Sequence, residues 1–181
     1  MKYLNNFIRV YDNVISGQTC NILIDLFEHK YKDNHEVHDT ELYKFHQLNL
    51  GQNQELQTIS QNFAKALVPY MEEYFRSVDV SQYVGIQGFE EVRIKRYIKN
   101  TNDQFKTHVD VTDKESARRY LIAMLYLNDN NGVTEFPTLG MSITPKQGSI
   151  VMFPPMWLFP HAGRIPTDDD KYIMMTSLHY L

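Results

Sequence analysis

The second half of the chain is a succession of short strand-like segments that leaves almost no room for helices. From Glu91 onward, apolar stretches that alternate with polar residues or run unbroken follow one another at short spacing. Turn signals such as Asn130-Asn131-Gly132 and Leu139-Gly140 separate some of these stretches. The pattern predicts an antiparallel sandwich or barrel. The expected strands cover residues 92–98, 104–111, 119–127, 133–137, 141–145, 149–154 and 171–181.

The first half has a different pattern, with apolar residues at helical spacing in two segments. Residues 17–30 and 53–76 each carry one apolar stripe, which predicts two amphipathic helices that cover a sheet. Thr19 is the expected N-cap of the first helix, and Pro69 should kink or shorten the second. The remaining segments are expected to be a loop at 31–40, a strand at 41–50 and a second loop at 77–91.

Composition narrows the class of protein. A length of 181 residues predicts a single domain, and 43% hydrophobic with 22% charged residues excludes wholesale disorder. The formal charge of −4 argues against nucleic acid as a partner, because nucleic-acid binders are usually basic. The single cysteine, Cys20, cannot form an internal disulfide.

Residues 1–16 show no signal peptide and no apolar run is long enough for a membrane span, so we expect a cytoplasmic protein without a membrane partner. The oligomeric state stays open.

Two histidines and one carboxylate are the strongest signal of chemistry. His108 and Asp110 lie two residues apart in an expected strand, so their side chains point to the same face. The apolar segment 120–127, which we expect to be buried, follows them, and His161 comes after a further apolar run. Two histidines and a carboxylate form the facial triad of non-haem Fe(II) oxygenases, which leaves coordination positions open for a cosubstrate and O₂.

Lys171 is a candidate anion receptor, which such a site needs if its cosubstrate is a dicarboxylate. It lies ten residues after His161 and opens the last expected strand, directly before an apolar segment. A lysine there is poorly explained as a surface charge, although protection of a strand edge is the structural alternative. The acidic turn before it, Asp168-Asp169-Asp170, is expected to be solvated.

Several segments in fixed order resemble the 2-oxoglutarate/Fe(II)-dependent dioxygenases, and more narrowly their prolyl 4-hydroxylase-like branch. The core of the likeness is the histidine–aspartate–histidine set followed by Lys171. The resemblance covers about residues 92–176, half of the chain. Further matching segments are Arg96-Tyr97, Tyr126-Leu127-Asn128, residues 131–137, and Pro145-x-x-Gly148 followed by Phe153.

The resemblance implies an α+β, mainly β fold, with a double-stranded β-helix of the jelly-roll or cupin kind over residues 91–181 and buttressing helices and loops over residues 1–90. It implies an enzyme that decarboxylates 2-oxoglutarate to succinate and CO₂ and hydroxylates an unactivated C–H bond. The implied cofactors are Fe(II), 2-oxoglutarate as cosubstrate and O₂, with ascorbate as a reductant. The implied roles are iron binding and catalysis for His108, Asp110 and His161, binding of the distal carboxylate of 2-oxoglutarate for Lys171 and Tyr126, and lining of the pocket for Tyr97.

The sequence departs from the family pattern where the substrate would bind. Asn131 and Val133 replace a Gly and a Glu of the family's Gly-Gly-Glu-Thr segment, and Ser177 stands where many prolyl hydroxylases carry a tryptophan. The expected substrate is a proline-containing peptide or protein. The alternatives are a free amino acid or other small molecule, a barrel that binds metal without turnover, and a cupin-type hydrolase or isomerase. Arg118 and Arg119 are candidates for binding an acidic substrate group or pairing with a loop carboxylate.

Overall fold

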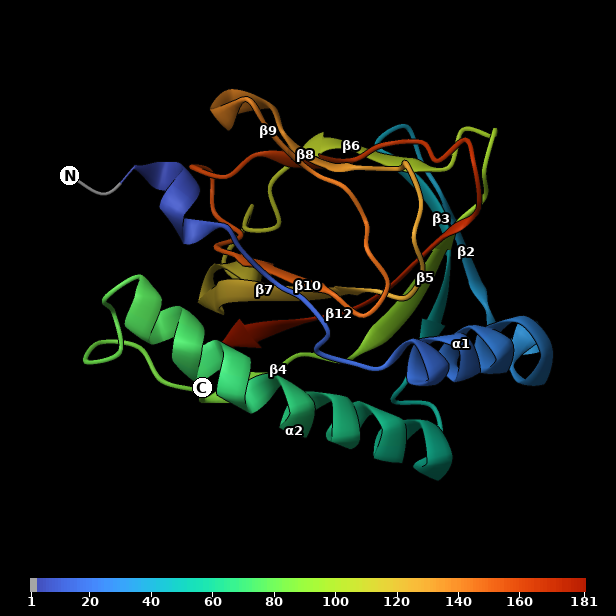
Figure 1. Ribbon diagram of the computed structural model, residues 1–181, viewed down its shortest axis with the longest axis horizontal. Coiled ribbons are helices and arrows are strands. Elements are labelled where there is room, and N and C mark those ends of the chain that lie inside the picture. The colour runs from blue at the N-terminus through green and yellow to red at the C-terminus, as the bar shows by residue number, and fades with distance from the viewer. Residues whose placement is uncertain (1–2) are drawn as a thin grey trace.

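A rolled sheet dominates the computed structural model, which describes residues 3–181 (Figure 1). Residues 1 and 2, which open the stretch inspected for a signal peptide, lie outside the described part. The strand order is β1-β10-β7-β12-β5-β3-β6-β11-β8-β9, with β2 added to β3 and β4 to β12. The sheet curls so that β6, β8 and β9 face β7, β10 and β12 across the interior, as a double-stranded β-helix requires. The strands are β1 (Arg9–Tyr11), β2 (Glu36–Asp39), β3 (Tyr43–Asn49), β4 (Gly88–Phe89), β5 (Arg93–Tyr97), β6 (Gln104–His108), β7 (Arg119–Tyr126), β8 (Thr134–Phe136), β9 (Met141–Ile143), β10 (Ile150–Phe153), β11 (His161–Gly163) and β12 (Lys171–His179).

Two helices cover the outer face of this sheet (Figure 1). The first, α1 (Gly17–Asp25), continues into a π-helical turn at Leu26–Lys30, and the second is α2 (Gln54–Ser77). The N-cap of α1 is Ser16 and not Thr19 as expected, because the Ser16 hydroxyl accepts the backbone N–H of Thr19 at 3.2 Å. Short 3₁₀ helices occupy Leu4–Phe7, Lys32–Asn34, Ser116–Arg118 and Pro137–Leu139.

The helix α2 runs through Pro69 without being shortened. A proline inside a helix removes one hydrogen bond and crowds the preceding turn, at a cost of about 3 kcal/mol. Leu67 and Met71, on either side of it, are fully buried against the sheet. Packing of the apolar stripe therefore outweighs the local penalty, which is the usual source of helix stability in proteins.

The strands expected after Glu91 are all present, while β1, β2, β4 and β11 were not expected. Residues 31–40, interpreted as a loop, contain β2, and the strand expected at 41–50 is β3. The prediction of a loop was wrong because β2 is largely exposed and polar, so its sequence has no apolar alternation. Its extended form depends on pairing with β3, from Glu36 opposite Gln47 to Asp39 opposite Lys44.

Alternate residues of the central strands face two separate cores. On β7, Leu121, Ala123 and Leu125 pack toward α1 and α2. Ile122 and Met124, between them, point into the interior of the roll. The helices therefore bury the outer face of the sheet, and the side chains on its inner face line a cavity.

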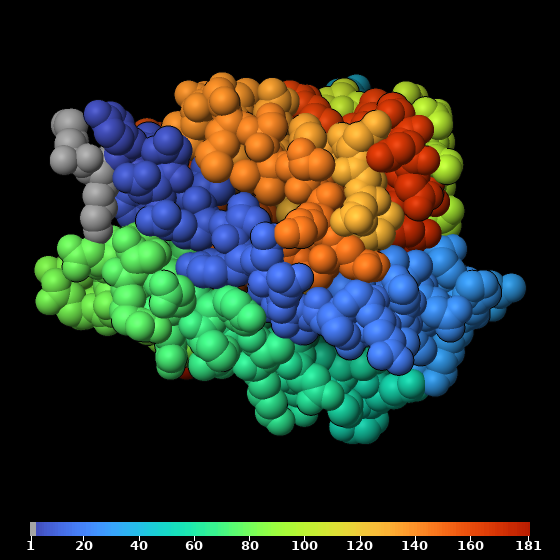
Figure 2. All heavy atoms as spheres, viewed as in Figure 1, coloured from blue at the N-terminus to red at the C-terminus, as the bar shows by residue number. Residues whose placement is uncertain are grey.

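The N-terminal segment lies in the seam between α2 and the sheet, where Figure 2 shows it in blue between the green and orange parts of the chain. Within it, β1 pairs with β10, and the Tyr74 hydroxyl of α2 donates to the carbonyl of Phe7 at 2.8 Å. The backbone N–H of Val14 donates to the carbonyl of Gly148 at 2.8 Å, just before β10 begins. The segment thus joins the helical layer to the strand that precedes the second histidine.

Replacing Gly148 with alanine is predicted to lower the free energy of unfolding by at least about 2 kcal/mol. Gly148 has φ of +75°, and a Cβ there would lie 2.2 Å from the carbonyl oxygen of Ile15. Chemical denaturation measures the change. Gly85→Ala is the control, since a Cβ at Gly85 meets nothing within 4 Å, and it should change the free energy by less than about 0.5 kcal/mol. Equal effects of the two substitutions would contradict the prediction.

Candidate active site

The three ligand candidates converge at one end of the roll. His108 is the last residue of β6 and His161 the first of β11, and the two strands pair so that these histidines lie opposite each other. Asp110 follows the end of β6, where its backbone N–H donates to the carbonyl of Pro155 at 3.1 Å. The ligand atoms of the three residues all lie within 4.8 Å of one another. The predicted convergence is therefore present, although Asp110 lies beyond the strand that was expected to hold it.

Both imidazoles are oriented by hydrogen bonds on the side away from the cluster. Nδ1 of His108 lies 2.8 Å from the carbonyl oxygen of Lys106, and Nδ1 of His161 lies 3.1 Å from that of Phe159. A carbonyl accepts only from N–H, so Nδ1 carries the proton and Nε2 turns its lone pair toward Asp110. This is the arrangement in which histidines bind metals.

The cluster has the charge and the free lone pairs of a cation site. His161 Nε2 lies 3.3 Å from Asp110 Oδ2, and this oxygen is buried without a hydrogen-bond donor anywhere in residues 3–181. Burial lowers the pKa of His161 to about 4, although Asp110 acts to raise it, so the imidazole is neutral at pH 7. Burial acts to raise the pKa of Asp110, but the neighbouring His108, His161 and Lys95 act to lower it and outweigh burial. Two imidazoles and one buried carboxylate fit a divalent metal ion.

The cluster opens onto a cavity inside the roll that also contains Lys171. Lys171, the first residue of β12, is 2% exposed, and its ammonium donates to the carbonyl of Gly132 at 2.6 Å. Burial lowers the pKa of this lysine to about 7. Tyr97 lies opposite Lys171 on β5 and also lines the cavity, as expected. A buried ammonium with one carbonyl partner is well suited to receive a carboxylate.

Tyr126 has a different place from the one expected. Its ring is completely buried, and its hydroxyl donates to Thr134 Oγ1 at 2.8 Å. Thr134 lines the cavity and Tyr126 does not, so the tyrosine stands behind the threonine. Sequence reasoning singled out the tyrosine because of the Tyr-Leu-Asn match and missed Thr134, although Thr134 lies in another matching segment.

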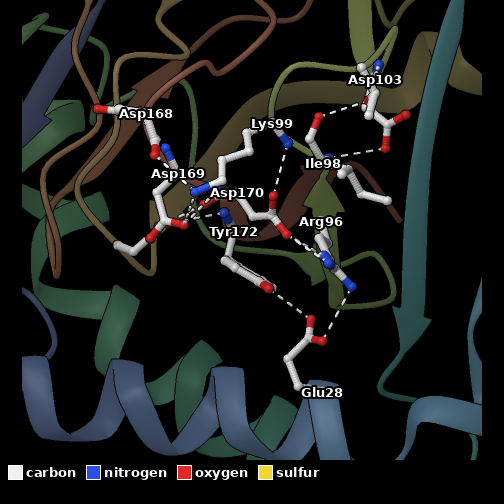
Figure 3. A network of polar contacts seen from close by, with 11 residues as sticks. Glu28, Arg96, Ile98, Lys99, Asp103, Asp168, Asp169, Asp170 and Tyr172 are labelled. Atoms are coloured by element: carbon white, nitrogen blue, oxygen red, sulfur yellow. Dashed lines mark hydrogen bonds and ion pairs between the residues drawn. The ribbon is translucent and has the colours of Figure 1, made fainter.

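The opposite face of β5 and β12 carries a polar network that holds the start of β12 (Figure 3). Arg96 binds Asp170 through Nε at 2.8 Å and Nη2 at 2.7 Å, and reaches Glu28 at 3.2 Å. Glu28, in the π-helical turn after α1, also accepts the hydroxyl of Tyr172 at 2.8 Å. Arg96 precedes Tyr97, and Asp170 and Tyr172 flank Lys171. The network therefore fixes from outside the backbone that carries both cavity residues.

The acidic turn 168–170 is part of this network, so the prediction that it is merely solvated was wrong. Asp170 accepts the backbone N–H of Lys99 at 2.8 Å in addition to Arg96. Asp168 accepts the backbone N–H of Asn131 at 3.0 Å. Asn131 in turn donates to Thr167 Oγ1 at 2.7 Å and accepts the Thr167 backbone N–H at 2.8 Å. Asn131, a departure from the family pattern, thus ties two loops together.

Lys95 and Arg119 are two further charged residues of the site region. Lys95, two residues before Tyr97 on the same face of β5, lines the cavity and was missed. Its position two residues from Tyr97 in an expected strand was the available signal. Arg119 pairs with the loop carboxylate of Glu90 at 2.8 Å and donates to the carbonyl of Asp110 at 3.0 Å. This decides between the two roles considered for that arginine.

Comparison with known proteins agrees with this geometry. Residues 92–179 match the family described as the 2OG-Fe(II) oxygenase superfamily. No curated protein matches the chain. Similar solved structures include a viral collagen prolyl hydroxylase from Paramecium bursaria Chlorella virus-1 in complex with 2-oxoglutarate, with 19% identity over 97% of each chain and a TM-score of 0.71. A Pseudomonas putida prolyl-4-hydroxylase has 15% identity over 97% of this chain and 93% of its own, with a TM-score of 0.72. A Trichoplax adhaerens prolyl hydroxylase, in complex with a hypoxia inducible factor peptide fragment, has 11% identity over 96% of this chain and 84% of its own, with a TM-score of 0.75.

These likenesses confirm the predicted jelly-roll fold, and the family match confirms the predicted oxygenase class. Members of that class use Fe(II), 2-oxoglutarate and O₂. Among the described residues, no helix is both long and apolar enough to cross a membrane.

The cluster is predicted to bind one divalent metal ion per chain through its histidines and aspartate. Titration calorimetry with Co(II), an oxygen-stable substitute for Fe(II), measures this. Removing one ligand, as in His161→Ala, should weaken binding at least about a hundredfold. His29→Ala is the matched control, because His29 is exposed in the π-helical turn after α1 and its loss should leave the affinity unchanged. Undiminished binding by the His161 variant would contradict the assignment.

The network around Arg96 is predicted to stabilise the fold. Arg96→Met removes charged hydrogen bonds to Asp170 and Glu28, which are partly buried, and should lower the free energy of unfolding by about 1–3 kcal/mol. Arg76→Met is the control, because Arg76 is exposed and contacts Glu72 and Glu73 on its own helix, and this substitution should cost less than about 0.5 kcal/mol. Denaturant titrations that fail to separate the two variants would count against the network.

Proposed function

We propose that this chain, whose residues 92–179 belong to the 2OG-Fe(II) oxygenase superfamily, hydroxylates an unactivated C–H bond of a peptidyl proline. One observation carries the proposal. Two imidazole nitrogens and a carboxylate turn their lone pairs toward one point, and the cavity beside them ends at a buried lysine. The first feature fits the metal of this family, and the second fits its dicarboxylate cosubstrate.

Each group of the site has a proposed role. His108, Asp110 and His161 hold Fe(II) through Nε2, a carboxylate oxygen and Nε2. The Lys171 ammonium binds the distal carboxylate of 2-oxoglutarate, Tyr97 lines the same pocket, and Thr134, supported by the Tyr126 hydroxyl, completes the polar wall. When bound in such a site, Fe(II) supplies the activation of O₂ that couples decarboxylation of 2-oxoglutarate to oxidation of the substrate.

The chain itself orients the reactants and excludes water. Ile122, Met124, Phe153 and Ile173 line the cavity around the polar groups, so charges there interact in a medium of low dielectric. Carbonyl partners on Nδ1 prevent the imidazoles from rotating. The helices and the Arg96 network hold the strands that carry these side chains, so the geometry is set before the reactants arrive.

A groove of about 300 Å³ outside the cavity is the proposed substrate site. It shares Lys95, Phe105, Asp110 and Met175 with the cavity, so a bound chain would pass next to the metal ligands. Ser177, in place of the family's tryptophan, also lines it. The smaller side chain favours a second candidate, a free amino acid or other small molecule as the substrate. We further propose a single functional domain in the cytoplasm, and ascorbate as reductant stays a prediction.

Incubation with Fe(II), 2-oxoglutarate, O₂ and a panel of proline-containing peptides and free amino acids tests the proposed reaction. The expected result is succinate release that depends on one of the panel members, with the gain of one oxygen atom in that member by mass spectrometry. A peptide product supports the first candidate, and a free amino acid product supports the second. Absence of substrate-stimulated succinate from a metal-loaded protein would leave the non-catalytic barrel as the better description.

The affinity for 2-oxoglutarate is predicted to fall as the pH rises above 7. Burial lowers the pKa of Lys171 to about 7 in the free protein, and only the protonated form attracts the carboxylate, so binding above pH 7 requires uptake of a proton. The dissociation constant should rise about fivefold from pH 7 to 8 and about tenfold from pH 8 to 9, as measured by calorimetry on the Co(II) form.

Lys171→Arg provides the control for this pH dependence. A guanidinium stays charged over the whole range, so the dissociation constant of the variant should be nearly constant with pH. A wild-type dissociation constant that does not change with pH would show that Lys171 is charged without the cosubstrate or does not bind it.

A further inference from the structure

Lys95 is a buried cation that the proposed reaction does not use. It is 7% exposed and points from β5 into the cavity. Within residues 3–181 its ammonium has no hydrogen-bond acceptor and no carboxylate at ion-pair distance. Its near neighbours are two rings, with Nζ 4.2 Å from the centre of Phe45 and 5.8 Å from that of Phe105.

Such an arrangement is unfavourable for the protein alone. An ammonium largely withdrawn from water loses much of its hydration, and cation–π contacts return only part of that free energy. Lys171, the other buried lysine of the cavity, at least donates to a backbone carbonyl. Methionine has nearly the same length and would fill the same space without a charge. The presence of a lysine at this position is therefore best explained by binding of an anionic ligand.

The position of Lys95 shows where that anion would lie. On β12, Lys171 is opposite Tyr97, and Ile173 is opposite Lys95. Lys95 thus lies two residues along β5 from Tyr97, the residue opposite Lys171. Two residues of a strand span about 7 Å. Lys95 lines both the cavity and the outer groove, as Asp110 does. An anion on Lys95 would lie between the metal ligands and the groove, on the side from which the substrate approaches.

None of the surrounding carboxylates pairs directly with Lys95, although Asp110 acts to raise its pKa from beyond ion-pair distance. Arg119 is paired with Glu90, and Arg93 lies 3.9 Å from Glu91. Across the sheet, β3 presents Gln47 beside Lys95, and β12 presents apolar Ile173. Asp110 is the remaining acid that lines both spaces, and its charge is needed for the metal. A metal ion held by Asp110 would take up the charge of that carboxylate and leave the Lys95 ammonium without a carboxylate of its own, which suits an anionic group on the substrate.

We propose that Lys95 determines substrate specificity by binding a carboxylate that the substrate carries close to the hydroxylated carbon. The inference rests on the proposed function, since it assumes that the groove receives the substrate and that Lys171 receives 2-oxoglutarate. Two sources provide the same chemistry: the α-carboxylate of a free imino acid, and an acidic side chain next to a peptidyl proline.

Binding of matched probes to the Co(II) and 2-oxoglutarate-loaded protein tests the proposal by calorimetry. The first pair is L-proline and L-prolinamide. The second set is short capped peptides with glutamate or glutamine on either side of a proline. The expected result is binding at least about tenfold tighter for the carboxylate member of one comparison, with the advantage reduced to within about twofold in Lys95→Met. The comparison that shows the preference identifies the source of the carboxylate.

Two control variants separate a role in substrate binding from other roles. Lys65→Met removes an equal charge from the exposed side of α2, far along the chain from the ligands, and should keep the carboxylate preference. Lys171→Met should weaken the binding of 2-oxoglutarate, whereas Lys95→Met should leave that binding unchanged. Thermal unfolding adds a readout without ligand, because removal of an uncompensated buried charge should leave Tm unchanged or raise it.

The proposal is overturned if the wild type prefers no carboxylate in any comparison, or if Lys95→Met keeps the preference. It is equally overturned if Lys95→Met weakens the binding of 2-oxoglutarate as much as Lys171→Met does. That result would place Lys95 in the cosubstrate site. A lower Tm together with a retained preference would show a structural lysine. Failure of the proposed function is a separate result, namely no binding of 2-oxoglutarate by the metal-loaded wild type.

Discussion

The antiparallel pairing of β6 with β11 is the constraint on which the whole site depends. It places His108 opposite His161, and directly opposed residues of such a pair have Cα atoms about 4.5–5.5 Å apart. A slip of the register by one residue would turn one imidazole to the other face of the sheet. The strand β6 ends at His108, which frees Asp110 to approach both histidines. The remaining structure keeps these two short strands in register.

The strands β5 and β12 show how one sheet serves two purposes. Their inner faces present Tyr97 and Lys171 to the cavity, and their outer faces present Arg96 and Tyr172 to the π-helical turn after α1. The π-helical turn after α1 places Glu28 where it reaches both outer residues. The charged groups on the outer face pair with one another in this network. The buried cations inside have few partners of their own, as expected where a protein reserves charge for ligands.

Much of the fold and the main elements of the site could be predicted from the sequence, because both depend on local patterns. Alternating apolar residues fix the strands after Glu91, and the spacing of His108 and Asp110 fixes their common direction. Pairing between distant segments could not be predicted. The strand β2 forms because it pairs with β3. The helix α2 continues through Pro69 because residues before and after the proline pack against the sheet. Thr134 and Lys95 were missed although each had a local signal, because the rolled sheet was needed to show which faces meet in the cavity.

The central claim is that the triad and Lys171 form one cavity for a metal ion and 2-oxoglutarate. The visible spectrum under anaerobic conditions, after addition of Fe(II) and 2-oxoglutarate, tests it most directly, because a charge-transfer band requires both to be bound together. The account predicts a weak band in the wild type, no band in His161→Ala, and a weakened band at limiting 2-oxoglutarate in Lys171→Ala. A folded wild-type protein without the band, or a band that both substitutions leave unchanged, would contradict the account.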